Sequence, residues 1–366
     1  MTPMVSVTID TGALRHNLQV IRGLAPKSRV MAVIKANAYG HGLICAARAL
    51  DAADAFAVAR VDEGLALREA GIKTPILLLE GVLDAEQLEA AAAADFELVV
   101  HTPEQIELLQ AAPSSNRFKV WLKLDSGMNR LGFKGEAFRS AHQALSKCSA
   151  LKAPINLITH LASADMPELP TTAEQLMVFA AATRSLPGER SVESSAALLG
   201  FPDSQADWVR PGLLLYGASP FRGSTGADHG LRPVMTLRSR IIAVKDLVVG
   251  DQVGYGGDWT ATRPTRLAIA AVGYGDGYPR SASSGTPVLV NGEHAALAGR
   301  VSMDMIAIDV TDVKRAPKAG DPVVLWGEGL PVEEVAVWAE TAPYTLLCGI
   351  NQRVAIDPYP RTMDAK

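Results

Sequence analysis

The sequence predicts an α/β fold: an N-terminal (β/α)8 barrel over residues 1–230, followed by a mostly β domain over residues 231–366. The first observation is an alternation of about eight short apolar runs with helical patterns, from residue 30 to about residue 220. Parallel strands need crossover connections, so this alternation indicates a parallel sheet, and about eight units match a closed barrel. The second observation is a change after about residue 230 to β-rich runs broken by Gly, Pro and Asp.

The expected barrel strands are the apolar runs, and helical patterns separate most of them. Asp62 is expected to cap one helix and Gly71 to end it, while Thr102 followed by Pro103 marks the start of another. An open doubly wound sheet is the alternative; no Gly-x-Gly-x-x-Gly follows the first strand, which disfavours it. The first run starts at Val30, and the others are 55–59, 75–81, 96–101, 118–125, 155–161, 190–198 and 209–217.

The second domain is expected to begin near residues 223–232, where Gly, Ser and Asp cluster. One convincing helical pattern lies in it, at 332–341, and the opening strand at 5–10 could join either domain. Its β-rich runs are 235–247, 265–275, 286–299, 302–310 and 322–329.

Composition excludes several classes of function. Lys and Arg number 35 against 39 Asp and Glu, a net charge of −4, whereas proteins that coat nucleic acid or anionic membranes usually lean basic. No secretory signal opens the sequence, and no apolar run approaches the ~20 residues of a membrane helix. Cys45, Cys148 and Cys348 are far apart and odd in number, which predicts no metal pair, no disulfide framework and a reducing cytoplasm.

Chemistry-bearing residues follow the expected strands, where barrel enzymes place their sites. Lys35 is the clearest candidate among them for chemistry. An amine beside an apolar strand loses hydration, which favours its neutral, nucleophilic form. The set suits an anionic, phosphate-bearing ligand and an amine-based covalent step. Its members are Lys35, Asn37, Tyr39, His41, Lys123, Asp125, Arg130, Thr159, His160, Asp165, Glu193, Ser194, Ser195, Arg210, Gly212 and Tyr216.

Six motifs, in order, together resemble the alanine racemase family. They are VIKANAYGHG (33–42), KLDSGMNRLG (123–132), VRPGLLLYG (209–217), VGYGGDW (253–259), GYGDGYPR (273–280) and GRVSMDM (299–305). The resemblance runs from about residue 5 to about residue 355. It implies a pyridoxal 5′-phosphate enzyme, a cytoplasmic homodimer with shared active sites, that interconverts L-alanine and D-alanine.

The resemblance also implies the catalytic roles. Lys35 holds the cofactor as an aldimine and is the base for the D face, while Tyr255, reaching the partner's site, is the base for the L face. Arg210 faces the pyridine nitrogen; because an arginine cannot accept a proton, that nitrogen stays unprotonated. His160 links Arg210 to Tyr255, and a cationic Arg–His pair would lower the pKa of the tyrosine.

The remaining implied residues bind phosphate or substrate or line the entrance. Tyr39, Ser195, Gly212 and Leu213 hold the phosphate, and Gln352 stands where many members have a phosphate-binding tyrosine. Arg130 and the partner's Met303 contact the substrate carboxylate, and a carbamate on Lys123 would orient Arg130. The inner channel is Tyr274 and Ile350. Further out lie Arg280, Arg300 and Asp165, for which simple surface salt bridges are the alternative.

Three alternatives stay open at this point. A racemase of broader specificity would also accept serine. A basic amino-acid decarboxylase has a similar fold, but such enzymes place an acid where Arg210 stands. A non-catalytic pyridoxal-phosphate carrier would be the barrel alone, without the ~130 residues after residue 230.

Overall fold

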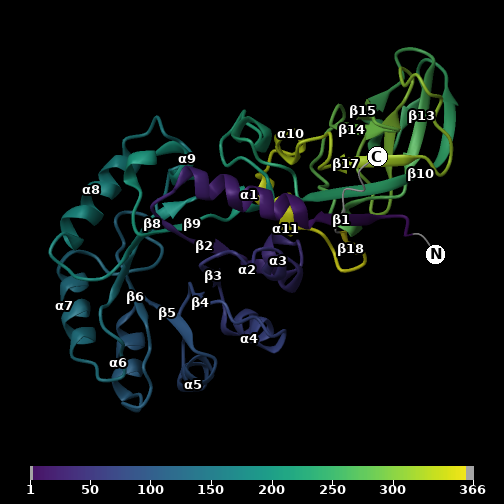
Figure 1. The fold of residues 1–366 in the computed structure, drawn as a ribbon. Coiled ribbons are helices and arrows are strands. Elements are labelled where there is room, and N and C mark those ends of the chain that lie inside the picture. The colour runs from purple at the N-terminus through teal and green to yellow at the C-terminus, as the bar shows by residue number, and fades with distance from the viewer. Residues whose placement is uncertain (1–2, 360–366) are drawn as a thin grey trace. The chain divides into compact units, whose positions relative to one another are not determined.

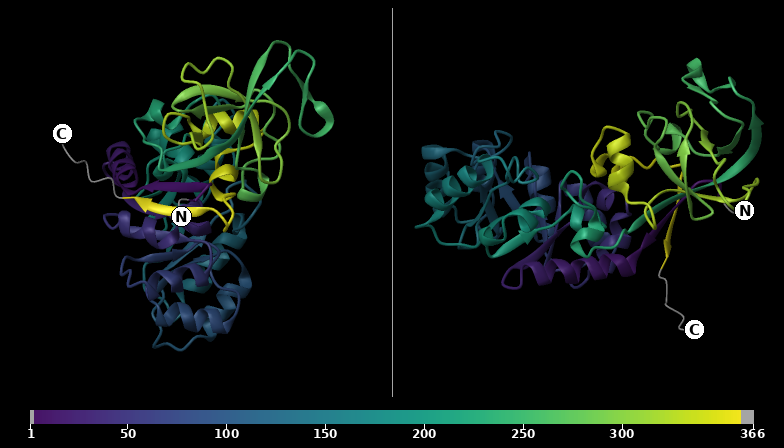
Figure 2. Two further views of the ribbon diagram at one scale, coloured as in Figure 1. Left: turned by 90° about the vertical axis from the view of Figure 1, so that its right-hand side faces the viewer. Right: turned by 90° about the horizontal axis from the view of Figure 1, so that it is seen from above.

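The computed structural model describes residues 3–359, which form two compact units (Figures 1 and 2). The barrel unit contains residues 17–38 and 43–215. The C-terminal unit contains the residues up to His16, residues 39–42 and the residues from Tyr216 onward. The predicted limits of 1–230 and 231–366 follow a change of pattern along the chain, whereas these units are defined by contacts in space.

Eight parallel strands close into a barrel, in the order of the chain, which confirms the predicted fold class (Figure 1). Val30 pairs with Val209, so the last strand returns to the first. The strands are β2 (Arg29–Val33), β3 (Ala55–Val58), β4 (Ile76–Leu78), β5 (Phe96–Val100), β6 (Val120–Lys123), β7 (Asn156–Ile158), β8 (Arg190–Ser194) and β9 (Trp208–Arg210). Each lies within a predicted run or begins one residue outside it. Most of these strands are almost continuously apolar, as strands buried on both faces are, whereas β8 reads RSVES.

Helices connect the barrel strands. They are α3 (Leu43–Ala49), α4 (Val61–Glu69), α5 (Ala85–Ala93), α6 (Pro103–Ala111), α7 (Gly135–Ser146), α8 (Thr171–Thr183) and α9 (Ser195–Gly200). Thr102 caps α6 by accepting from the Gln105 amide, as predicted. The cap predicted at Asp62 is wrong: α4 begins at Val61, and the carboxylate of Glu63 accepts the Arg60 amide instead.

Two tryptophans meet inside the barrel. Trp121 on β6 and Trp208 on β9 lie on strands that are not neighbours, yet their ring centroids are 6.2 Å apart, so the rings fill the interior. Trp121 donates to Glu97 Oε2 (2.7 Å) and Trp208 to Glu189 Oε2 (2.8 Å).

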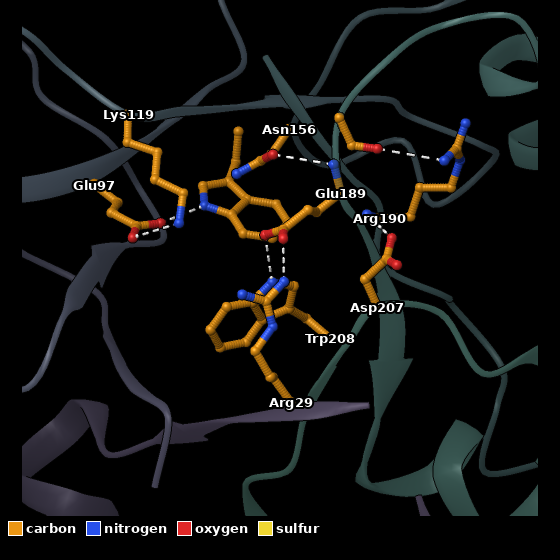
Figure 3. A network of polar contacts seen from close by, with 10 residues as sticks. Arg29, Glu97, Lys119, Asn156, Glu189, Arg190, Asp207 and Trp208 are labelled. Carbon is orange, nitrogen blue, oxygen red and sulfur yellow. Dashed lines mark hydrogen bonds and ion pairs between the residues drawn. The ribbon is translucent and has the colours of Figure 1, made fainter. Parts of the chain in front are cut away.

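Charged residues surround this tryptophan pair, as Figure 3 shows. Arg29 pairs with Glu189 and lies 4.2 Å over the Trp208 ring, while Lys119 pairs with Glu97 at 2.9 Å. Arg29 and Trp208 each begin a strand, so the amino ends of the strands are filled and the carboxyl ends are left for a site.

The C-terminal unit is built on an eight-stranded sheet in the order β13-β16-β15-β14-β17-β10-β1-β18. The opening strand belongs here, because β1 pairs antiparallel with β10 and parallel with β18. The strands are β1 (Ser6–Asp10), β10 (Met235–Leu247), β13 (Thr265–Ala270), β14 (Pro287–Val290), β15 (Glu293–Leu297), β16 (Ile306–Asp309), β17 (Pro322–Trp326) and β18 (Ala355–Tyr359). A small hairpin joins β11 (Gln252–Val253) and β12 (Trp259–Thr260).

After residue 230, the described part of the C-terminal unit has one α-helix more than the pattern predicts. The predicted helix is α10 (Val332–Trp338), and the second is α11 (Pro343–Cys348), which is too short at six residues to show a helical period. Helix α1 (Thr11–Leu24) runs from this unit into the barrel unit. Among the residues described, no helix is both long and apolar enough to span a bilayer.

Candidate functional site

The carboxyl ends of the barrel strands bring the predicted barrel residues together. Lys123 and Arg210 are the last residues of β6 and β9, and Ser195 directly follows β8. Lys35 and His160 each lie two residues beyond a strand, β2 and β7. Backbone bonds join these ends: the Val33 amide donates to Pro211 O (2.9 Å) and the Thr159 amide to Ser191 O (3.2 Å).

Lys35 begins a left-handed turn that no pattern in the sequence predicts. Helix α2 (Lys35–Tyr39) has φ values of 52° at Ala36, 54° at Asn37 and 54° at Ala38. None of these residues is glycine, and a left-handed residue with a side chain costs roughly 1–2 kcal/mol. Such strain persists only where neighbours hold it, and it clusters at functional sites. The half-buried Lys35 therefore leaves its strand with a defined direction.

Arg210 is buried and held by neutral acceptors. Its exposed fraction is 5%, and it donates to Ser191 Oγ (2.5 Å), Thr159 O (2.6 Å) and Val192 O (3.3 Å). Burial lowers the pKa of the guanidinium to about 10, and the nearby Glu193 carboxylate works in the opposite direction. Arg210 thus remains a cation at neutral pH, in a fixed orientation.

Four cations converge on one place at this end of the barrel. Burial, followed by the charges of Arg210, Arg130 and Lys35, lowers the pKa of Lys123 to about 8, against a smaller opposite effect of Asp125. Such a set is suited to an anionic ligand, because cations gathered without matching carboxylates repel one another.

His160 lies among the same cations, and its lowered pKa favours the neutral imidazole, so the positive charge of the predicted Arg–His neighbourhood comes from the cations around His160. Burial is the main cause: it lowers the pKa of the imidazole to about 3, together with Arg210 and the other three cations. A neutral imidazole can still donate one hydrogen bond and accept another. His160 can therefore take part in hydrogen bonds at this place, but it adds no positive charge.

Ser195, Gly212 and Leu213 are brought together, as predicted for a phosphate site. All three are buried. The Ser195 hydroxyl accepts the amides of Gly212 (2.9 Å) and Leu214 (3.3 Å), which fixes the loop after β9 against the end of β8. This arrangement presents a hydroxyl and backbone amides at the carboxyl ends of neighbouring strands.

Arg130 projects from a loop folded back onto the end of β6. The Phe133 amide donates to Lys123 O (3.0 Å), and the Asp125 amide donates to Phe133 O (2.9 Å). Gly132 has φ +120°, and a Cβ there would lie 2.8 Å from the Asp125 nitrogen, so only glycine allows this return. Arg130 itself is exposed, as is Asp165 in the β7–α8 connection.

A groove on the C-terminal unit gathers four of the predicted residues. Tyr255, Tyr274, Arg280 and Arg300 all line it. Arg300 forms an ion pair with Asp258, and the Arg280 guanidinium lies 6.0 Å from the Tyr274 ring centroid. Tyr255 is 71% exposed, so this tyrosine is not a packing residue of its own unit.

Tyr274, Met303 and Ile350 lie on three loops that Arg353 ties together. The Gly275 amide donates to Met303 O (2.9 Å), and the Asn351 amide donates to Asp276 O (3.1 Å). Arg353 donates to the buried Asp276 (2.7 Å) and to Asp304 (2.8 Å). The motif pattern did not single out Arg353, because its role depends on two carboxylates distant in sequence.

The remaining two predicted residues also belong to the C-terminal unit. The Tyr39 ring is 4.8 Å from that of Tyr216 and 5.9 Å from that of Tyr344, and burial raises the pKa of its hydroxyl. Gln352 is exposed. The predicted site residues thus form two groups, one at the mouth of the barrel and one on the C-terminal unit. Among the residues described, no cluster of His, Cys, Asp and Glu could hold a metal ion.

Comparisons with known proteins agree with this geometry. Residues 9–220 match the family model of the alanine racemase N-terminal domain, and residues 234–357 match that of the C-terminal domain. The biosynthetic alanine racemase of Escherichia coli O157:H7 is 50% identical over 352 residues, which cover 96% of this chain and 98% of that protein.

Solved structures show the same fold. The crystal structure of biosynthetic alanine racemase from Pseudomonas aeruginosa matches with a TM-score of 0.94 at 43% identity, covering 98% of this chain and 100% of that one. The crystal structure of alanine racemase from Bartonella henselae is described with covalently bound pyridoxal phosphate. It matches with a TM-score of 0.88 at 28% identity, covering 98% of this chain and 100% of that one. The predicted resemblance and the predicted combination of barrel and β domain are confirmed.

Proposed function

The chain belongs to the alanine racemase family, and on that premise we propose that it interconverts L-alanine and D-alanine with pyridoxal 5′-phosphate as cofactor. The observation that carries the proposal is the convergence of Lys35, Lys123, Arg130 and Arg210 around His160 at the carboxyl ends of the barrel strands. Both family domains are present, so the carrier and decarboxylase alternatives are set aside.

The donor set suits the cofactor. Lys35 would supply the amine that binds the cofactor's aldehyde, and the Ser195 hydroxyl with the backbone around Gly212 and Leu213 would hold the phosphate. Tyr39 and Gln352 complete the phosphate contacts. Once bound, pyridoxal phosphate withdraws electrons from the substrate's α-carbon and makes its C–H bond acidic.

Arg210 limits this electron withdrawal. In the proposed complex it would donate a hydrogen bond to the pyridine nitrogen, and because it cannot accept a proton it would keep that nitrogen unprotonated. Arg210 would thereby weaken the electron withdrawal that the cofactor supplies and favour proton return over side reactions such as transamination. The three neutral acceptors around Arg210 hold its guanidinium plane for this contact.

Racemisation needs a base on each face of the α-carbon. Lys35 removes or returns the proton on the D face, and Tyr255 does so on the L face. His160 passes a hydrogen bond from Arg210 toward Tyr255. Arg130 and the Met303 backbone hold the substrate carboxylate, so that the C–H bond points at one base or the other.

Lys123 has the properties of a lysine that takes up carbon dioxide. A carbamate forms from the neutral amine, and a pKa of about 8 leaves a substantial neutral fraction near physiological pH. The carbamate would carry a negative charge beside Arg130 and orient it toward the substrate. It would also offset part of the repulsion among the four cations.

The entrance favours a small substrate. Tyr274 and Ile350 form its inner part, and Arg280, Arg300 and Asp165 form its outer part. Cationic side chains on the way in attract the carboxylate of the amino acid. Alanine is the substrate of the proposal, and racemase assays over several amino acids test whether serine is a second one.

We assign the enzyme to a homodimer in which each active site takes residues from both chains. Tyr255 is exposed on its own chain, together with Met303 at 54%. A two-fold dimer creates two equivalent shared sites, each with Lys35 from one chain and Tyr255 from the other. We place it in the cytoplasm, which agrees with three free cysteines and no disulfide among the described residues.

Mixing two inactive variants tests the shared site. Lys35→Ala removes the cofactor's amine and Tyr255→Phe removes the hydroxyl base, so each homodimer should be nearly inactive toward alanine. In a mixed dimer, one site takes both defects and the other takes neither. Random exchange makes about half of the dimers mixed, each with one of its two sites intact, so roughly a quarter of the parent's activity should return.

The control for this experiment is a subunit-exchange assay with tagged chains. If chains exchange and no activity returns, Lys35 and Tyr255 act within one chain and the shared-site proposal fails. If Lys35→Ala alone turns over normally without added amine, the assignment of Lys35 itself fails.

A further inference from the structure

We propose that Glu63 is a positioning residue for Lys35, because its carboxylate holds the left-handed turn that carries the lysine. The inference rests on the proposed role of Lys35 as the amine that binds pyridoxal phosphate. Glu63 lies in the first turn of α4, on a different βα connection from Lys35. None of the six sequence motifs contains it.

The carboxylate of Glu63 accepts three backbone hydrogen bonds. Its Oε1 accepts the Ala36 amide at 2.6 Å, and its Oε2 accepts the amides of Ala59 at 2.8 Å and Arg60 at 3.2 Å. The two oxygens thus bind two separate segments of the chain. Oε2 binds the connection from β3 to α4, and Oε1 binds the turn after β2.

The bond to Ala36 acts directly on Lys35. The Ala36 nitrogen belongs to the peptide group that joins Lys35 to Ala36. Holding this N–H therefore holds the plane of the peptide group on the carboxyl side of Lys35. That plane and the preceding strand together set the direction of the lysine side chain. Glu63 therefore acts on the orientation of Lys35 through the backbone, without touching its amine.

The turn needs such a restraint because its backbone is unfavourable. Four consecutive residues without glycine, Ala36 to Tyr39, have φ between 51° and 54°. Other hydrogen bonds also support the turn: Ala38 donates to Ile34 O (2.9 Å), Asn37 Oδ1 accepts the Leu43 amide (2.8 Å), and His41 Nδ1 lies 2.9 Å from Tyr39 O. None of these three involves the Lys35–Ala36 peptide group, and a left-handed turn without enough supports relaxes.

The neighbouring Asp62 provides a matched control. It lies one residue before Glu63 in the same first turn, carries the same charge and is exposed. Replacing either acid changes the net charge and the charge at the start of α4 equally. A loss shared by both variants would come from that charge. A loss confined to Glu63 would come from the hydrogen bonds of its carboxylate, and the exchange rate of the Ala36 amide separates the bond to the turn from those to Ala59 and Arg60.

The test uses the holoenzyme with Glu63→Ala, Glu63→Gln and Asp62→Ala. Glu63→Ala should lower kcat by up to about 100-fold, with little change in the KM for alanine, because misplacing a reacting group has that size of effect. It should also speed the release of pyridoxal phosphate and the hydrogen exchange of amides 36–40. Glu63→Gln keeps one acceptor oxygen and should be intermediate, and Asp62→Ala should resemble the parent.

The outcomes separate this inference from the proposed function. Borohydride reduction and peptide mapping of the parent locate the lysine that carries the cofactor; a lysine other than Lys35 would refute the proposed function. If the cofactor is on Lys35 while Glu63→Ala keeps its kcat and its amide exchange, the positioning role is refuted alone. Equal losses in Glu63→Ala and Asp62→Ala also refute it. If Glu63→Ala does not fold, Glu63→Gln decides the same comparison.

Discussion

His160 should remain neutral through the range of pH in which an ordinary histidine takes up a proton. The ordinary imidazole pKa is about 6.5. Burial and the charges of Arg210, Lys123, Arg130 and Lys35 lower the pKa of His160 to about 3 in the folded chain. Protonating it would add a fifth cation to a place that already holds four.

The lowered pKa has a consequence for stability, and its sign follows from linkage. Above about pH 6.5 neither the folded nor the unfolded chain protonates this residue, so it has no effect. As the pH falls from about 6.5 toward 3, the unfolded chain gains a proton that the folded chain refuses, and stability is lost. At about pH 5 this loss amounts to about 2 kcal/mol relative to neutral pH.

Two measurements on the protein without pyridoxal phosphate check this, since the phosphate's negative charge would offset part of the cationic field. The ring protons of His160, assigned by their absence in His160→Gln, should not shift between about pH 7.5 and about pH 4.5. Urea unfolding of the parent should lose about 2 kcal/mol more between about pH 7.5 and about pH 5 than that of His160→Gln. The assignment matters because burial also lowers the pKa values of His101 and His142.

A His160 signal that titrates near the ordinary value would refute the argument. It would mean that the cations do not converge as the structure shows, or that His160 is open to water. It would also restore the cationic Arg–His pair that the sequence suggested. Equal pH dependence of the parent and His160→Gln would refute the stability part on its own.

Two further predictions concern Arg210 and the tryptophan pair. Arg210→Glu should lower the rate of racemisation and raise the conversion of alanine to pyruvate, because an acid lets the pyridine nitrogen hold a proton. A coupled pyruvate assay measures this conversion. A racemisation rate like that of the parent, with no pyruvate formed, would contradict the role of Arg210. Trp121→Ala should lower the free energy of unfolding by about 3–5 kcal/mol, measured in urea, while Trp121→Phe keeps most of the volume and should lose less. Equal stability of Trp121→Ala and the parent would show that the ring does not support the barrel.

The barrel was predictable from sequence because its signals are local. Most strands are short, almost continuously apolar runs, since both faces of the barrel sheet are buried; β8, which reads RSVES, is an exception. The cap of α6 was predictable for the same reason, from Thr102 and Pro103. The α4 cap was not, because the acceptor for the Arg60 amide is Glu63, three residues on, rather than Asp62.

The candidate site was predictable as a list of residues but not as an electrostatic environment. Lys35, Lys123 and Arg210 could be placed at strand ends, since the strands themselves could be placed. The charge state of His160 could not, because it depends on cations from four different loops or strands. Sequence motifs suggested a cation, and desolvation in a field of like charges makes the imidazole neutral.

The two ends of the barrel explain why its charges are tolerated. At the amino ends, Arg29 and Lys119 each face a carboxylate, Glu189 and Glu97, around buried indole rings. At the carboxyl ends, the cations outnumber the nearby acids, so the chain by itself bears their mutual repulsion. In the proposed complex, the phosphate of the cofactor would offset that repulsion, which would contribute to the free energy of binding. On this proposal, the residues that repel one another in the chain by itself are those that bind the cofactor.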